Sequence, residues 1–417
     1  MIDSIRITNY KSIEEATIET PLITLLVGPN GSGKSSAIQA LGILKNFFLN
    51  SNRSLDDILN LGYLRLGNHS DVVFRHDNTR VIEFEARLSD GESHLAYTLG
   101  FGPSNKGTSK IQLLVQGSQA FEVSFTIPYA QNTFDKKPML IRQKQGDTIT
   151  ERQCTLIWNG ITMSVEPAEL SNVPYVQTMM RTHLDSFLGI YIVPPTTAFV
   201  NSLYSVVGVP DKKTLLSIPD STLVTMLMQD SDLEEAASSY MEATFGVRNV
   251  APRYSTYPNI SVEVGRKRFK VNVVNEGFGL NRSLFLLATL LTVPKRSTIA
   301  VEEPENHLHP RAQGELARQL VVIAQEQAKQ LVITTHSEHM LLGFLSAVSK
   351  GNLKPSQIAV YFCELEPSQM RSRFARAEIN ELGQVKGGLK DFFEVDVEAL
   401  SDIFKSLEET KLADNSG

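Results

Sequence analysis

The chain has 417 residues, of which 42 % are hydrophobic and 21 % are charged. This composition is that of a globular protein, and it excludes a disordered or collagen-like chain. Forty basic and forty-six acidic residues leave a net charge of −6. A protein coated in basic charge is therefore excluded, although a local basic groove for nucleic acid stays open.

The cysteines and the apolar runs indicate the cellular compartment in which the protein is expected. Cys154 and Cys363 lie far apart in sequence, which argues against a disulfide framework and fits a reducing cytosol. The longest apolar run, from Leu284 to Leu291, is well short of the roughly 18 to 20 residues that span a bilayer. The N-terminal residues alternate polar and apolar side chains and lack the pattern of an export leader. We therefore expect a cytoplasmic protein without a membrane segment.

The N-terminal region predicts strands followed by a helix. Alternating side chains predict half-buried strands at residues 4–7 and 16–18. Residues 22–27 are almost continuously apolar and end at a glycine, which is typical of a strand buried on both faces of its sheet. From residue 34 to residue 48 the apolar side chains recur at helical spacing.

The middle of the chain changes character twice. Residues 71–165 predict antiparallel β structure with two hairpin turn signals, Asp90-Gly91 and Asn159-Gly160. Residues 178–250 then predict helices. Ser231 to Glu234 has the form of a capping box, and Gly246 stands where that helix would end.

The last part of the chain predicts a parallel α/β unit. A strongly apolar helix is expected at residues 279–291. Short apolar strands follow at 298–301 and 331–334, with a helix at 311–327 between them. Strand, helix and strand in this order form the crossover unit of a parallel sheet.

Residues 28–35 read Gly-Pro-Asn-Gly-Ser-Gly-Lys-Ser and match the phosphate-loop pattern. Glycines let the backbone approach phosphate closely, and backbone N–H groups at the start of a helix then bind the anion. Lys34 is expected to reach the β- and γ-phosphates, and the Ser35 hydroxyl to bind Mg²⁺. The expected nucleotide contacts are Gly28, Asn30, Gly31, Ser32, Gly33, Lys34, Ser35 and Ser36.

Two adjacent acids follow the predicted strand at 298–301. Glu302 is expected to hold the Mg²⁺ shell, and Glu303 to orient or deprotonate the attacking water. Acids at the carboxyl end of a strand lie where open α/β sheets place their ligands.

Four histidines follow the acids, and they allow a zinc site as an alternative. They are His307, His309, His336 and His339. No cysteine lies near them in sequence, and a histidine at a strand end can instead sense a phosphate. We therefore do not favour zinc.

Together, these motifs resemble those of an ABC-type ATPase of the SMC, RecF and OLD group. The segment from Ile5 to Ile13, leading into the phosphate loop, is similar to the opening of that group. Val301 to Pro310 resembles its Walker B motif and D-loop, and Thr334 to Ser337 resembles its switch-histidine strand. Glutamate stands at 302 where many ABC ATPases have aspartate, and it retains the charge.

The resemblance implies an α/β fold, a P-loop ABC-type ATPase head with an antiparallel β subdomain and a helical insert. The ATP-binding core would comprise 1–60 and 265–417, the β region 65–175, and the helical insert with its following hairpin 176–264. The resemblance also implies ATP and Mg²⁺ as cofactors. Lys34, Glu303 and His336 would be catalytic, with His336 sensing the γ-phosphate.

In this group two heads enclose two ATP molecules, and a signature loop of one head binds the nucleotide of the other. The candidate loop here spans residues 275–282, with Asn275, Gly277 and Gly279 as the expected contacts. It departs from the usual Leu-Ser-Gly-Gly pattern, and Asn275 or Asn281 stands in for the missing serine. The resemblance therefore implies a homodimer, or a higher homo-oligomer, closed around ATP.

The resemblance further implies a head that drives a DNA-directed or antiphage-defence effector, as in DNA repair or in defence systems such as Septu and PARIS. A Toprim nuclease needs more residues than follow His336, so we expect a separate nuclease or toxin as partner. A nucleotide-gated scaffold with little turnover is the alternative. A transporter ATPase is disfavoured, because the phosphate loop and Glu302 are too far apart in sequence. The basic run 266–270 leaves nucleic acid open as a direct ligand.

Overall fold

The computed structural model contains three β-sheets in its described part, together with the helices that pack on them. The predicted turn at Asn159-Gly160 lies outside this part. The structure describes residues 1–49, 55–90, 93–103, 107–115, 121–129, 137–145, 148–158, 163–166, 182–183, 185–266 and 269–386.

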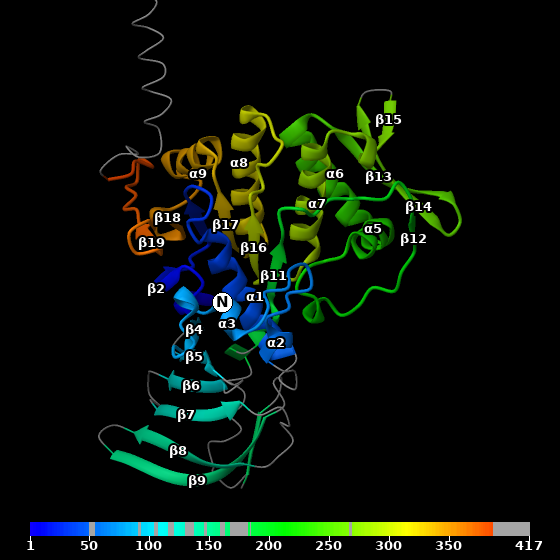
Figure 1. The fold of residues 1–417 in the computed structure, drawn as a ribbon. Coiled ribbons are helices and arrows are strands. Elements are labelled where there is room, and N and C mark those ends of the chain that lie inside the picture. The colour runs from blue at the N-terminus through cyan, green and yellow to red at the C-terminus, as the bar shows by residue number, and fades with distance from the viewer. Residues whose placement is uncertain are drawn as a thin grey trace, which may run out of the picture.

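A six-stranded sheet forms the centre of the molecule (Figure 1). Neighbouring strands are parallel from β11 to β18, and β19 is antiparallel to β18. Every residue of the first four strands is buried, which explains why these segments are largely apolar. The spatial order is β11 (Ile190–Val193), β16 (Thr298–Glu302), β17 (Gln330–Thr335), β3 (Ile23–Val27), β18 (Ile358–Glu366) and β19 (Arg371–Arg376).

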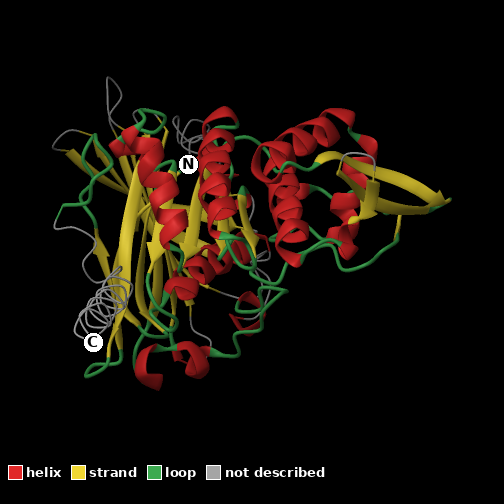
Figure 2. Cartoon of the chain, turned by 90° about the horizontal axis from the view of Figure 1, so that it is seen from above, coloured by secondary structure: helices red, strands yellow, loops and turns green. Residues whose placement is uncertain are grey.

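Helices cover both faces of the central sheet (Figure 2). Successive side chains of a strand point to opposite faces, so Leu26 of β3 packs with α1 (Lys34–Leu49) while Leu25 packs with the helices of the other face. The helices of that other face are α7 (Phe278–Thr292), α8 (Pro310–Glu326) and α9 (Glu338–Ser349). The predicted helices at 34–48, 279–291 and 311–327 are therefore confirmed to within one or two residues.

A nine-stranded antiparallel sheet lies on the other side of α1. Phe84 and Tyr97 of this sheet belong to the same apolar cluster as α1, and thirteen of the sixteen residues of α1 are buried. The predicted strands at 4–7 and 16–18 belong to this sheet, as β1 and β2. The spatial order is β10 (Met163–Glu166), β9 (Thr148–Trp158), β8 (Lys137–Gln145), β7 (Phe121–Tyr129), β6 (Gly107–Val115), β5 (Ser93–Phe101), β4 (Ile82–Asp90), β1 (Ile2–Tyr10) and β2 (Ile13–Glu19).

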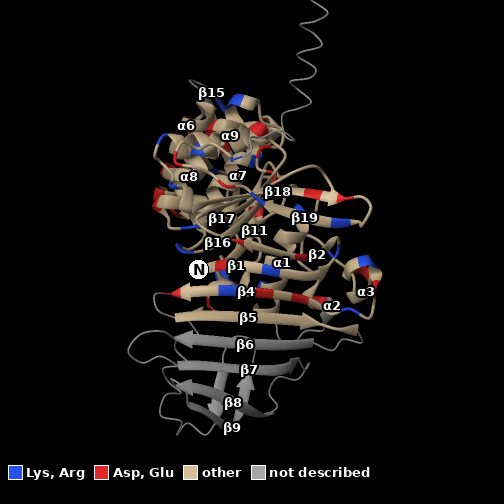
Figure 3. Ribbon diagram, turned by 90° about the vertical axis from the view of Figure 1, so that its left-hand side faces the viewer, with Lys and Arg blue, Asp and Glu red and all other residues tan. Residues whose placement is uncertain are grey.

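Charged residues mark the outer edge of the central sheet. Figure 3 shows acidic residues on β18 beside basic residues on β19. The pairs are Glu366 with Arg371 at 3.0 Å and Glu364 with Arg373 at 3.7 Å. Since these side chains are 26 % to 63 % exposed, each pair adds only about 0–1 kcal/mol to stability.

The range 176–264 contains helices and also a strand of the central sheet. Helices α5 (Asp220–Gln229) and α6 (Ser231–Phe245) follow one another, and Asp230 caps α6 in place of the predicted Ser231. Gly246 ends α6 with φ of 66°, as predicted. β11 from the same range pairs with β16 of the central sheet. The sequence did not predict this strand, because four consecutive apolar residues are too short to show helical or strand periodicity. The boundaries of the three regions remain our proposal.

Shorter strands and helices complete the fold. A third sheet projects from the helices (Figure 1) and consists of β12 (Tyr204–Ser205), β14 (Asn259–Arg266), β13 (Arg248–Thr256) and β15 (Phe269–Asn272). The short helices are α2 (Leu55–Ile58) and α3 (His69–Val72), with 3-10 turns η1 (Phe74–His76), η3 (Lys212–Thr214), η4 (Val273–Asn275) and η5 (Pro355–Gln357).

The contact between β3 and β18 gives a first prediction. A Cβ atom at Gly28 would lie 2.0 Å from the backbone oxygen of Cys363. We expect Gly28→Ala to lower the free energy of unfolding by about 2–4 kcal/mol, because the clash is with backbone and cannot relax. Thermal unfolding without nucleotide measures this. Gly208→Ala is the control, since the space around Gly208 is open among the described residues. Equal melting temperatures for both variants would contradict the prediction.

Candidate functional site

The carboxyl ends of three parallel strands meet at one edge of the central sheet. Glu302 of β16 pairs with Thr334 of β17, and Thr335 of β17 pairs with Val27 of β3. The residues that follow these strands therefore lie side by side. They are the phosphate loop after β3, Glu303 after β16 and His336 after β17.

The phosphate loop holds its lysine at its centre. Lys34 is 6 % exposed, and its Nζ donates hydrogen bonds to the backbone oxygens of Gly28 at 2.9 Å and Pro29 at 2.7 Å. Burial lowers the pKa of Lys34, and Glu303 and Glu305 oppose that shift. The Ser32 hydroxyl accepts a further bond at 3.4 Å, so the partners of the lysine among the described residues are neutral and its charge stays available to an anion.

The glycines of this loop are required by its shape. Gly31 and Gly33 have φ of 78° and 94°, a region that other residues rarely adopt. A Cβ atom at Gly33 would also lie 2.5 Å from Ser372 Oγ. Ser372 comes from β19 and shares a hydrogen bond of 2.7 Å with Ser12 Oγ, so β19 closes the loop from the side.

Glu302 is a buried carboxylate in contact with the loop. It is 6 % exposed, and the Ser35 hydroxyl donates a hydrogen bond to it. Burial raises the pKa of Glu302, and the neighbouring Glu303 raises it further, while Ser35, Lys11 and Arg282 lower it. The carboxylate is therefore under-compensated in the protein alone.

Glu303 is held from two sides. Its Oε2 accepts a hydrogen bond from Asn306 Nδ2 at 2.7 Å, and its Oε1 lies 3.3 Å from His336 Nε2. Its backbone has φ of 47°, which is uncommon for a residue with a side chain. Both the carboxylate and the imidazole remain partly exposed, at 28 % and 31 %. This pair can thus reach a substrate.

Arg282 supports both acids from the helix α7, and the sequence patterns assigned it no role. It is 2 % exposed and donates hydrogen bonds to the backbone oxygens of Glu302 and Glu303, both at 2.5 Å. Because its partners lie about twenty residues further along the chain, spacing within a motif could not reveal them.

Lys11 and Gln39 are further residues that the sequence patterns left without a role. Lys11 Nζ and the Tyr10 hydroxyl both donate to Gln39 Oε1, at 2.8 Å and 3.1 Å. Burial lowers the pKa of Lys11, and Glu302 opposes that shift, so the two charges interact. Lys11 therefore brings a second cation toward the acids, from β1 and its following turn.

The predicted signature residues lie at the start of α7. Asn275 and Gly277 are exposed, whereas Gly279 packs against the backbone oxygen of His307. Asn281 is 4 % exposed, and its side-chain amide bonds the backbone N–H and oxygen of Phe199, each at 2.9 Å. Asn281 is therefore engaged inside its own chain.

His307 and His309 make contacts within the local fold. The rings of His307 and Phe278 are edge-to-face with centroids 5.0 Å apart. His309 Nδ1 accepts the backbone N–H of Arg311 at the start of α8. In the described residues, no group of three or more His, Cys, Asp or Glu side chains is arranged to hold a metal ion.

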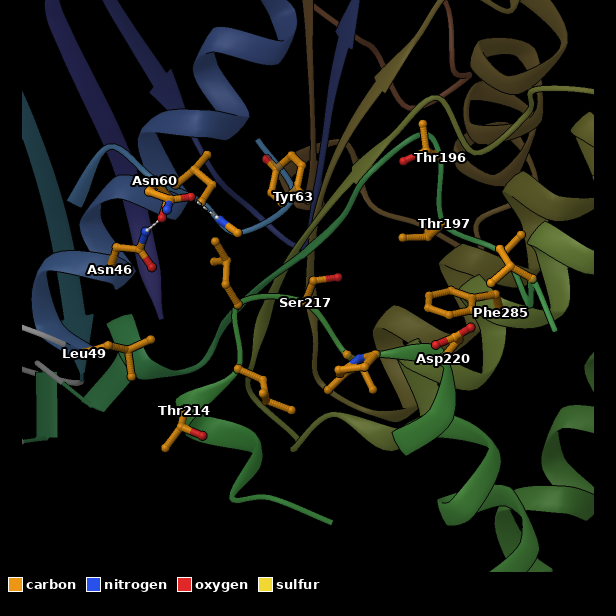
Figure 4. A pocket seen from close by; sticks show the side chains of 18 residues that line it. Asn46, Leu49, Asn60, Tyr63, Thr196, Thr197, Thr214, Ser217, Asp220 and Phe285 are labelled. Carbon is orange, nitrogen blue, oxygen red and sulfur yellow. Dashed lines mark hydrogen bonds between the residues drawn. The ribbon is translucent and has the colours of Figure 1, made fainter. Parts of the chain in front are cut away.

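A pocket of about 590 Å³ lies between the end of α1, the loop after α2, the chain segments that follow β11 and precede α5, and Phe285 of α7 (Figure 4). Tyr63 and Asp220 lie on its two sides, and Asp220 is the only charged residue among the described residues that line it. The Tyr63 hydroxyl is buried and without a hydrogen-bond partner in the described part of the chain. With no basic side chain in its described lining, the pocket is poorly suited to nucleotide phosphates, in contrast to the loop around Lys34.

Comparisons with solved structures define the class of fold. An SMC head bound to the C-winged helix domain of ScpA matches with a TM-score of 0.50 at 12 % identity, over 90 % of this chain and 97 % of that one. The SMC head domain of Thermotoga maritima matches with a TM-score of 0.39 at 12 % identity, over 91 % and 99 %. An SMC head from Pyrococcus furiosus, bound to the C-terminal domain of ScpA, matches at 0.44 and 11 %, over 98 % and 99 %.

The fold is thus that of a P-loop ATPase head of the SMC kind, as the sequence predicted. The chain belongs to the AAA ATPase domain family, which matches residues 1–149 and 225–341. It is therefore an ATP-binding ATPase. No curated protein matches the chain. Of the helices in the described ranges, none is both long and apolar enough to cross a bilayer.

The burial of Glu302 gives a prediction on stability against pH. Because the folded-state pKa is raised, the cost of ionising this carboxyl is absent below the unfolded pKa, grows as pH rises from there to the folded pKa, and is constant above it. We expect nucleotide-free Glu302→Gln to melt about 2 °C above the wild type at pH 8, with the difference vanishing toward pH 4. Differential scanning fluorimetry measures it, with the exposed Glu83→Gln as control. A lower melting temperature for Glu302→Gln at pH 8 would contradict the argument.

Proposed function

We propose that the edge formed by β3, β16 and β17 binds MgATP and hydrolyses it. The strand register carries this proposal, since it brings the phosphate loop, both acids and His336 together. The phosphate loop, from Gly28 to Ser36, would bind the phosphates through its backbone, with Lys34 moving from its carbonyl partners to the β- and γ-phosphates.

The residues present fit a magnesium ion. The Ser35 hydroxyl and the Glu302 carboxylate are already in contact and are both hard oxygen ligands. Mg²⁺ binds with few protein ligands, and nucleotide phosphates and water supply the others. When bound, the ion would compensate the charge on the transferred phosphoryl group. It would also relieve the uncompensated charge of Glu302.

The catalytic pair would be Glu303 and His336. Glu303 would accept a proton from the attacking water, or orient that water, since its carboxylate is held by Asn306 and is partly exposed. His336 would hold Glu303 from the other side and contact the γ-phosphate. The structure supports these roles through the 3.3 Å separation of the two side chains.

Two variants test these roles. Glu303→Gln should lower ATP turnover about 100- to 1000-fold, because it removes the proton acceptor. It should still bind ATP, whereas Lys34→Ala should lose ATP binding. Phosphate release and nucleotide binding by calorimetry measure the two effects. A Glu303→Gln protein that hydrolyses ATP at the wild-type rate would refute the assignment.

We further propose that two heads close around ATP, with the exposed start of α7 facing the nucleotide of the second head. Asn275 and Gly277 are exposed there, and an α-helix N-terminus attracts phosphate. Gly279, by contrast, would shape the loop, since a Cβ atom there would lie 2.5 Å from His307 O.

Oligomer size with and without ATP tests the closed dimer. In the Glu303→Gln background, ATP should double the mass measured by light scattering. Adding Gly277→Glu should abolish this doubling but leave ATP binding intact, since a Cβ atom at Gly277 meets no described atom within 4 Å. Gly208→Glu, in equally open space, is the matched control. Dimers of unchanged stability with Gly277→Glu would contradict the proposed interface.

We propose that this ATPase acts on a separate effector protein in antiphage defence or DNA repair. The proposal follows from the resemblance of the chain to the SMC, RecF and OLD group. The alternative is a nucleotide-gated scaffold that holds an effector and hydrolyses little ATP. The rate of ATP turnover by the wild-type protein distinguishes the two functions. The basic run at 266–270 is the candidate contact for nucleic acid. Phe269 and Lys270 of the basic run are exposed, while residues 267–268 lie outside the described part. Filter binding against salt decides it, because phosphate contacts weaken steeply with salt.

A further inference from the structure

Glu305 is a buried carboxylate that the proposed reaction leaves without a role. It lies three residues after the end of β16 and is 5 % exposed. Its Oε1 accepts hydrogen bonds from the Thr335 hydroxyl at 2.6 Å and from the backbone N–H of His336 at 2.9 Å. Burying a carboxylate costs free energy. Glu305 should therefore have a role that a small apolar side chain could not fill.

Two hydrogen bonds fix the orientation of the Thr335 hydroxyl. It donates to Glu305 and accepts from the backbone N–H of Ser337 at 2.9 Å. Ser337 in turn caps α9, accepting the Met340 N–H at 3.1 Å. The end of β17 and the start of α9 are thus joined to one oxygen of Glu305. His336 lies between these two linked elements, after Thr335 and before Ser337.

The side chain of His336 leads back to the proposed base. Its Nε2 lies 3.3 Å from Glu303 Oε1, while Asn306 holds the other oxygen of Glu303. A shift of His336 would therefore release one of the two contacts that orient Glu303. Misplacing a catalytic group by about 1 Å can cost about 100-fold in rate.

We propose that Glu305 is a positioning residue for ATP hydrolysis, which fixes His336 and, through it, the orientation of Glu303. This inference rests on the roles proposed above for His336 and Glu303. Glu305 links the loop after β16 to the end of β17, two segments that each carry one member of the pair.

The hydrogen bonds define what Glu305 must supply. Both bonds end on Oε1, so the required property is an acceptor at that point. Oε2 is buried and has no partner among the described residues. Burial also raises the pKa of the Glu305 carboxyl, so the charge is disfavoured rather than used. A neutral amide of the same length should therefore serve.

Two substitutions at this position test the proposal. Glu305→Ala should lower kcat about 10- to 100-fold and leave KM for ATP within about twofold, because the reacting groups are displaced and the phosphate loop is not. Glu305→Gln should stay within about threefold of the wild type, since it keeps the acceptor. An alanine variant with wild-type kcat, or a glutamine variant as slow as alanine, would overturn the proposal.

A double-mutant cycle separates positioning from a general effect on the fold. If Glu305 acts through His336, Glu305→Ala should reduce kcat less than about twofold further in the His336→Ala background. Multiplied losses would overturn the proposal. Thr335→Val gives a gentler variant, which should fold and lose about 3- to 10-fold in kcat by removing one of the two donors. Unchanged kcat in Thr335→Val would count against the linkage.

The same series distinguishes two kinds of failure. If Glu303→Gln hydrolyses ATP at the wild-type rate, the chemistry assigned to the site is wrong. If Glu303→Gln is inactive but Glu305→Ala is fully active, only the inference on Glu305 fails. The NMR signal of the ¹³C-labelled His336 ring adds a readout that needs no turnover. It should change in Glu305→Ala and stay near the wild-type position in Glu305→Gln.

Discussion

The backbone register of β3, β16 and β17 determines where the residues proposed to bind and hydrolyse ATP lie. A shift of one residue in any of these strands would move its terminal side chains to the opposite face of the sheet. It would thereby separate the phosphate loop from Glu302 or His336 from Glu303. Because both faces of these strands are buried, such a shift is costly: it would place side chains of the wrong size or polarity against the packed neighbours on each face.

The charges at this edge are unbalanced in the protein alone. Glu302 and Glu305 are buried with raised pKa values, and Lys34 is bonded to neutral oxygens, the Gly28 and Pro29 carbonyls and the Ser32 hydroxyl. A bound nucleotide and its cation would supply the opposite charges that these groups lack. Ligand binding should then stabilise the fold strongly, because it compensates groups that the protein holds at a cost.

Local patterns in the sequence were enough to predict the elements that carry the phosphate loop. The run at 22–27 became β3, and the helical spacing from residue 34 became α1, because both signals depend on neighbouring residues. The cap of α6 was placed one residue late, since Asp230 and Ser231 both suit a helix start. β11 was missed because four apolar residues have no diagnostic period.

The supporting residues of the site were harder to predict. Arg282 and Glu305 find their partners about 20 and 30 residues away in sequence, across elements that only the fold brings together. Their residue types also carry no fixed meaning, since an arginine or a glutamate in a loop is most often exposed. The roles of Glu303, His336 and the residues at 275–279 remain proposals, because they concern a nucleotide and a proposed second head.

Helix α1 begins at the phosphate loop and ends between two sheets. Because solvent reaches neither side of most of this helix, its backbone amides can exchange hydrogen only when one of the sheets separates from it. Deuterium uptake along α1 therefore reports how often a sheet separates from this helix, and a ligand bound at the loop would slow the uptake along the buried length of the helix. Deuterium uptake along this one helix thus measures how a nucleotide at the loop changes the packing of the nine-stranded sheet against α1.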